Sequence, residues 1–524
     1  MGDTAKDTRQ RIVAFTETRD LVVKERVLRM LLFGSKETRT RAKAERLFGQ
    51  GIEATRRDNY LRATARFEQA MNLYRMIPGT EEEEAACLKC LAAILLTLDK
   101  LPESESSFRH ALTLYQKIPG TVENQADCLY ALAITLREQG NLAESETLSR
   151  QSLALYQTIP GTEENQADCL YSLAITLYQQ GIPVDAEFIY RQSLVLYQAL
   201  PGTELGQADC LYNLAIALSD QNKSTEAESV RRQALTLYQT IPGTERDQAD
   251  CLHDLANTLD ELDKPAQAEP FFREALALYQ TIPSTQHEQA RCLYNLANTL
   301  HKLGKNAQAE PLYRQAITLY QTIPGTQQKQ ANCLNNLATC MLNLRKLSHA
   351  ESLYYQALTL YQKIPGTEYE QATSTYSLAT TLLSQGKLDP TEALYQDALK
   401  QAVSAALFND EYRYQLSSPT KRRAWVTNRA QPSMILAIAL AGVLEEASLV
   451  AELVAKWRMV GSLAAIPAAR NSDIFLITTM PDFTPEPEET LTRTPGPNLV
   501  LPHPRTTPLY QHPTIADRPR AHYR

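Results

Sequence analysis

Residues 166–181 read QADCLYSLAITLYQQG, and this stretch decides the fold. Its apolar side chains, Leu173 and Leu177 among them, recur at spacings of three and four and so line one face of a helix. Gly181 can adopt the left-handed conformation that closes a helix, and Pro183 suits the first turn of another. A second apolar stripe follows. The stretch therefore predicts a helix, a tight turn and a second helix.

This unit is repeated along the chain. The proline of an Ile-Pro-Gly tripeptide, or of a close variant, returns every 41 residues at Pro78, Pro119, Pro160, Pro201, Pro242, Pro283, Pro324 and Pro365. A cysteine, a tyrosine, a leucine and an alanine column keep the same interval. The small side chains mark where helices approach closely, and the leucines predict a core in which one Leu-to-Ala change costs about 2–5 kcal/mol. A fixed period of this length is typical of a solenoid.

The boundary between units also has a predicted structure. Pro201 and Gly202 are expected to stop the second helix of their unit. Thr203 is expected to cap the next helix, and Glu204 to add a favourable charge at its start.

These columns resemble the tetratricopeptide repeat. The segments CLNNLATC (333–340), LYNLANTL (293–300) and AEPLYRQAI (309–317) are similar to the longer repeats of kinesin light chains. The resemblance implies an all-α, right-handed superhelical solenoid of about nine helix pairs, whose first helices line a concave groove. Two units depart from the pattern, with Ser149 and Arg231 in place of the usual aromatic of the second helix.

Projecting the helical spacing outward from the core predicts four columns exposed in that groove. Tyrosine supplies large contact area, and asparagine carries both a donor and an acceptor for the backbone of an extended peptide. The predicted peptide-binding groove consists of Tyr130, Tyr171, Tyr212, Asn213, His253, Asp254, Asn257, Tyr294, Asn295, Asn298, Asn335 and Asn336. The alternative is that these side chains only solvate the groove or bond neighbouring helices.

Charge and composition limit the partner. The chain has a net charge of −7, and its negative charge lies between residues 51 and 410, whereas residues 1–50 have a surplus of Lys and Arg. An acidic body argues against nucleic acid as the main ligand. The aspartates of one column, Asp127, Asp168, Asp209 and Asp250, would attract Lys or Arg in a peptide. The expected partners are other proteins, bound as extended segments with a basic preference, and no membrane.

No cofactor, metal site or catalytic residue is expected. Seven of the nine cysteines occupy one equivalent position per repeat, so they cannot converge on an ion and are expected to be buried packing residues. The sequence shows no phosphate-binding loop, nucleophile elbow or HExxH pair. With no apolar run of membrane-spanning length and no secretory signal, a cytoplasmic, non-enzymatic protein is expected.

The C-terminal part has a different character. Residues 412–425, 435–442 and 449–463 resemble the helical stretch that joins tetratricopeptide repeats to the caspase-like CHAT domain, but the 61 residues after Leu463 are too few for that domain. The expected organisation is an N-terminal helical cap (1–41), the repeat solenoid (42–402), a helical extension (403–465) and a disordered, proline-rich tail (466–524). Two other hypotheses for the function stay open. The chain could be the regulatory arm of a peptidase system that lacks its own catalytic domain, or it could be a purely structural spacer.

Overall fold

The computed structural model describes residues 36–388, 392–412, 430–446, 448–450 and 453. Over these residues the secondary structure is helical, as the repeat pattern predicts. The chain divides into two units, one ending at Thr244 and the other beginning at Glu245. The expected N-terminal cap (1–41) lies outside the described residues except at 36–41, which begin the first described helix, and the proline-rich tail (466–524) lies wholly outside them.

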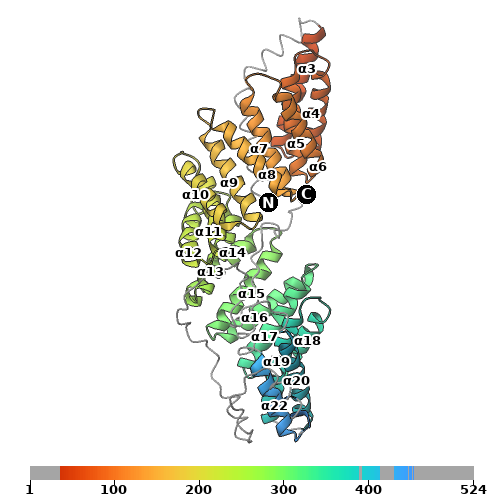
Figure 1. Ribbon diagram of the computed structural model, residues 1–524, viewed down its shortest axis with the longest axis vertical. Coiled ribbons are helices and arrows are strands. Elements are labelled where there is room, and N and C mark those ends of the chain that lie inside the picture. The colour runs from red at the N-terminus through yellow and green to blue at the C-terminus, as the bar shows by residue number, and fades with distance from the viewer. Residues whose placement is uncertain (1–35, 389–391, 413–429, 447, 451–452, 454–524) are drawn as a thin grey trace. The chain divides into compact units, whose positions relative to one another are not determined.

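The first unit is a stack of antiparallel helix pairs, coloured from red to yellow-green in Figure 1. Consecutive helices pack on one another throughout. The pairs are formed by α3 (Lys36–Arg56) with α4 (Tyr60–Tyr74), α5 (Glu81–Thr97) with α6 (Leu101–Tyr115), α7 (Val122–Glu138) with α8 (Leu142–Tyr156), α9 (Glu163–Gln179) with α10 (Pro183–Gln198), and α11 (Glu204–Asp220) with α12 (Ser224–Tyr238).

The second unit repeats this arrangement and extends it. Its pairs are α13 (Glu245–Glu261) with α14 (Pro265–Thr281), α15 (Gln286–Lys302) with α16 (Asn306–Thr322), α17 (Gln327–Asn343) with α18 (Leu347–Tyr361), and α19 (Glu368–Leu388) with α20 (Glu392–Tyr412). A further helix, α22 (Gln431–Val443), packs on α20. The expected boundaries at 42 and 402 fall inside α3 and α20, so these boundaries stay predictions.

The predicted columns form the core between helices. Leu173 and Leu214 are each 1% exposed, and Ala174 and Ala215 are completely buried. In the first helix pair, Gly51 stands at the position of this alanine, because a Cβ there would lie 2.8 Å from the Phe67 ring. All nine cysteines are buried, as expected of packing residues.

Polar residues in the small-residue column are also buried. The hydroxyls of Ser152 and Ser193 donate to the carbonyls of Ala126 and Ala167 at 2.8 and 2.7 Å. These bonds join the second helix of a pair to the first. They explain why serine can replace alanine here: the hydroxyl finds an acceptor in the helix that it touches.

The turns confirm one expectation and correct another. Gly181 has φ +79° after the end of α9, and Pro183 opens α10, as predicted. Thr203 caps nothing with its side chain. Its hydroxyl instead donates backwards to the carbonyls of Tyr197 and Leu200, at 2.5 and 3.0 Å. The threonine therefore bonds one carbonyl in the last turn of the preceding helix and one in the turn that follows that helix.

Candidate functional site

The first helices of successive pairs lie next to one another within each unit. In the first unit α5 contacts α7, α7 contacts α9 and α9 contacts α11; in the second, α13, α15, α17 and α19 are neighbours in the same way. We call the residues of these helices that lie between repeats the first-helix face. It contains every residue of the predicted groove.

In the first unit, this face joins repeats through tyrosine and asparagine. The side-chain amide of Asn213 donates to the Tyr171 hydroxyl, 42 residues earlier, at 2.8 Å. The Tyr171 ring packs on Tyr190 of its own pair, with centroids 6.0 Å apart. Tyr171 and Asn213 remain partly exposed, whereas Tyr130 and Tyr212 are buried, at 7% and 8% exposure.

In the second unit, His253 is the centre of a buried polar cluster. Its Nδ1 lies 3.2 Å from both Asp254 and Asn257, and its Nε2 lies 3.1 Å from the Asn295 amide of the next repeat. The Asn295 amide also donates to Asn257 Oδ1. Burial, together with the Arg291 charge, holds the pKa of His253 below its usual value, so this imidazole is neutral at pH 7.

The same relation continues one repeat later. The Asn336 amide donates to the Tyr294 hydroxyl at 3.0 Å and to Asn298 Oδ1 at 2.9 Å. The Asn335 amide donates to Asn336 Oδ1 at 3.3 Å, and the Ser374 hydroxyl donates to Asn335 Oδ1 at 2.8 Å. Much of the asparagine hydrogen-bonding capacity is therefore used between repeats.

The expectation that all four columns are exposed is wrong for half of the predicted site. His253 is fully buried, and Tyr130, Tyr212, Asn257, Tyr294 and Asn295 are between 4% and 8% exposed. The neighbouring first helix covers these positions, which spacing within one helix pair cannot show. The predicted site residues that keep part of their surface are Tyr171, Asn213, Asp254, Asn298, Asn335 and Asn336.

The aspartate column is also tied into the fold. The Tyr238 hydroxyl donates to Asp209 at 2.7 Å and the Tyr279 hydroxyl to Asp250 at 2.5 Å, each across 29 residues. Asp127 and Asp168 accept the same bond from the repeat tyrosine of their own pair. A carboxylate that accepts a hydrogen bond from a buried hydroxyl is less available to a ligand. The aspartate column is therefore expected to attract basic peptides less strongly than the sequence predicts.

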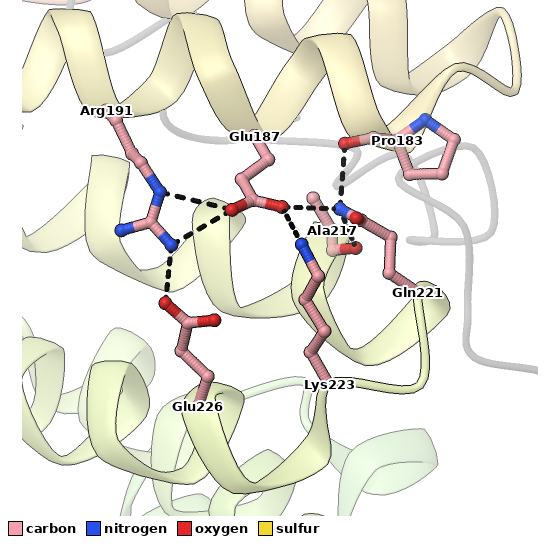
Figure 2. Close-up of polar contacts among 7 residues, drawn as sticks. All are labelled: Pro183, Glu187, Arg191, Ala217, Gln221, Lys223 and Glu226. Carbon is pink, nitrogen blue, oxygen red and sulfur yellow. Dashed lines mark hydrogen bonds and ion pairs between the residues drawn. The ribbon is translucent and has the colours of Figure 1, made fainter.

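A second surface, formed by the second helices, carries an ion-pair network that the apolar repeat pattern does not predict. Glu187 of α10 accepts from Arg191 of the same helix and from Lys223 of the next repeat, at 3.0 and 2.7 Å (Figure 2). Arg191 also donates to Glu226 at 2.5 Å, and Gln221 donates to Glu187 at 2.9 Å. These partners hold the pKa of Glu187 below its usual value even though burial opposes them.

The same ion-pair network recurs in later repeats, so it corresponds to a pattern in the sequence. Glu269 binds Arg273 and Lys305, and Glu310 binds Arg314 and Lys346, at the same separations of four and 36 residues. A Glu followed by an Arg four residues later and a Lys 36 residues later would have revealed it. The pairs are partly exposed, so each one contributes little stability.

One open cleft of about 680 Å³ lies on the second unit between α16 and α18, above α17. Leu334, Leu337 and Leu353 form its floor, and glutamine and threonine side chains form much of its rim. No group of three His, Cys, Asp or Glu side chains suited to a metal ion occurs in the described part of the chain. Across that same part, every helix is too short or too polar to cross a membrane.

The sequence matches the family model of the tetratricopeptide repeat at residues 83–158, 124–199, 207–281, 288–363 and 329–402, which together exceed half of the chain. This model does not describe a catalytic family. No curated protein matches the sequence.

Solved structures with similar folds have low sequence identity. A putative kinesin light chain with nearly identical repeats, from Podosopora anserina, is 16% identical over 38% of this chain and 95% of its own, with a TM-score of 0.34. The apo quorum sensor NprR of B. thuringiensis is 13% identical over 70% and 99%, with a TM-score of 0.46. A Rap protein in complex with the competence and sporulation factor is 16% identical over 66% and 99%, with a TM-score of 0.40. The repeat columns, the stacked helix pairs and the family match agree: this chain belongs to the tetratricopeptide repeat family, a fold that serves as a protein-interaction scaffold.

Proposed function

We propose that this chain is a non-catalytic scaffold that holds an extended segment of a partner protein along its first-helix face. The observation that carries the proposal is the continuity of that face within each unit. Many of its repeats present a tyrosine or an asparagine at positions 41 residues apart, and a peptide backbone also offers donors and acceptors at regular intervals. The proposal places the chain in the cytoplasm, where its nine buried thiols stay reduced.

The twelve predicted site residues divide into two roles. The buried ones, such as His253 and Asn295, fix the register between repeats by bonding across them. The partly exposed ones are the proposed contacts: Tyr171, Asn213, Asp254, Asn298, Asn335 and Asn336. Both amide hydrogens of Asn213 are used inside the fold, by Tyr171 and by the Asp209 carbonyl, so its Oδ1 is the atom that would accept a bond from a peptide N–H.

The partner preferred by this face is neutral or basic. Asp254 is partly exposed on it, and residues 51–410 have a surplus of Asp and Glu. Long-range attraction of this kind mainly accelerates association and weakens at high salt. Since the aspartate column is bonded to tyrosines, the preference for basic segments is expected to be modest.

Peptide selection tests the proposal. A random linear peptide library is selected against the full chain, and the affinities of the selected peptides are measured by fluorescence anisotropy. The variant Asn213→Ala with Asn335→Ala, one change in each unit, is expected to weaken binding at least about tenfold whichever unit holds the peptide, because the face of each unit loses a proposed contact. The matched control is Gln233→Ala with Gln315→Ala, two exposed residues on second helices.

Control affinity should stay within about twofold, as exposed residues outside an interface contribute little. Equal binding by wild type and by the asparagine variant would contradict the proposed face. Failure to select any peptide would instead favour the structural spacer.

One structural observation supports the alternative that this chain is the regulatory arm of a peptidase system. The chain continues after the last repeat pair into α22, which packs on α20 and contains the resembling residues 435–442. A caspase-like catalytic domain encoded in the neighbouring reading frame, and binding to this chain, would support this second candidate.

A further inference from the structure

The outer surface of α10 carries an apolar stripe. Val184, Phe188 and Val195 are 61%, 61% and 64% exposed. Along a helix, these positions differ by four and seven residues, so the three side chains lie in one line. Single exposed apolar residues are ordinary, but three large ones in a line on one helix form a patch that points to an interface.

The other second helices do not share this stripe. At the equivalent positions α12 has Thr225, Ser229 and Thr236, and α8 has Ala143, Thr147 and Ala154. Elsewhere, proline, serine, threonine or alanine occupies these three positions in α6, α14, α16 and α18. The stripe is therefore a property of this one repeat, and the small side chains on α8 and α12 leave room for an element that packs on α10.

Arg191 lies within the stripe, between Phe188 and Val195, and is held in place. Its guanidinium donates to Glu187 of its own helix and to Glu226 of the next repeat (Figure 2). Both bonds run through N–H groups in the guanidinium plane, while the faces of that plane stay available for stacking on an aromatic ring. The Arg191 side chain is 45% exposed.

The stripe is self-complementary. Its four positions are symmetric about the midpoint between residues 189 and 190. Two α10 helices that pair antiparallel across a two-fold axis at this midpoint would bring Val184 against Val195 of the partner subunit. The same axis would place Phe188 over Arg191 of the partner subunit, which joins a cation to an aromatic face twice.

We propose that α10 is the surface through which two copies of this chain associate, as an antiparallel α10 pair. This proposal is independent of peptide binding at the first-helix face, because it uses the opposite side of a helix pair and different residues. The apolar part of this interface is only one helix wide, which is narrow beside a standard interface of about 20–30 residues a side. The dimer is therefore reversible and forms as concentration rises.

Sedimentation velocity of the full chain over a range of concentrations measures this association. The variant Val184→Thr, Phe188→Ser, Val195→Thr gives α10 the residues of α12. It should weaken dimerisation at least about tenfold, since it removes the apolar centre of the interface. Its far-UV circular dichroism should not change, because all three side chains are exposed. The control Leu61→Ser alters an exposed apolar residue on a different second helix, 86% exposed on α4, and should leave the dimer intact.

Cross-linking tests the geometry. One preparation carries Val184→Cys and another Val195→Cys, and each is oxidised alone and in a mixture. Antiparallel pairing predicts a disulfide between the two chains in the mixture and little in either preparation alone. The native cysteines are all buried, so the wild-type chain should form no disulfide between copies and serves as the negative control.

Three results would overturn the proposal. The first is a chain that stays monomeric up to about 100 µM, well above the affinity of most specific complexes. The second is a dimer that the α10 variant does not weaken. The third is efficient cross-linking of Val184→Cys to itself, which would indicate parallel pairing.

Discussion

At the scale of single residues, a recurring tyrosine–aspartate hydrogen bond joins the end of the second helix to its own first helix in the pairs that carry the aspartate. The tyrosine column was identified from its interval alone. The aspartate 29 residues before it was predicted to face a ligand, but it accepts the tyrosine hydroxyl, as Asp209 does from Tyr238. Helical periodicity shows which positions lie outside the core of one pair. Helical periodicity cannot show which of these outer positions forms a hydrogen bond with a side chain of the other helix in the pair.

Tyr197 provides a test of this bond. Its hydroxyl donates to Asp168, whose carboxylate is only 4% exposed. Tyr197→Phe removes the donor and leaves the buried carboxylate short of a partner, so the free energy of unfolding should fall by about 1–3 kcal/mol. Urea unfolding followed by circular dichroism measures the change.

The same column supplies a control for Tyr197. Tyr115 is equally buried, but Ala86 stands where the aspartate would be. Tyr115→Phe should cost clearly less than Tyr197→Phe. Equal losses would mean that the tyrosine–aspartate bond adds nothing to the packing of the ring.

At the scale of helices, the period of 41 residues and the apolar stripes were sufficient to predict the helix pairs and the turns at Gly181 and Pro183. The burial of the first-helix face was not predictable in this way. His253 illustrates the difference: it stands in a column otherwise rich in tyrosine, yet the next repeat covers it and Asn295 bonds to it. Its burial depends on the distance between neighbouring pairs, which the pattern of one pair does not encode.

This burial makes the second unit sensitive to acid. The pKa of His253 is lowered by burial and by Arg291, and burial with the Lys329 charge lowers that of His287 to about 4. An unfolded histidine takes up its proton near pH 6.5, before either folded group does. The unfolded state then binds more protons, so stability is full above pH 6.5 and is lost as pH falls toward 4.

Thermal unfolding from pH 7.5 to 4.5 measures the effect of this linkage. His253→Asn with His287→Asn should flatten the acid side of the profile relative to wild type. The control His110→Asn changes an exposed histidine on α6 and should leave the slope as it is. A double variant with the wild-type slope would show that the acid sensitivity resides elsewhere.

At the scale of the whole molecule, the family, the all-helical class and the repeat number were accessible from sequence because every repeat contributes the same signal. The ion-pair network on the second helices and the α10 stripe were not found, since each depends on a comparison between repeats at outward positions. The two surfaces have separate roles in our account: first helices hold a partner peptide, and α10 joins two copies of the chain.

Hydrogen–deuterium exchange of the full chain, with and without a selected peptide at saturating concentration, tests the central claim most directly. The account predicts slower exchange in the first helices of the unit that holds the peptide, α9 and α11 or α15 and α17. Exchange in the second helices α10, α12, α16 and α18 should not change. Protection confined to the second helices, or to the cleft between α16 and α18, would contradict it.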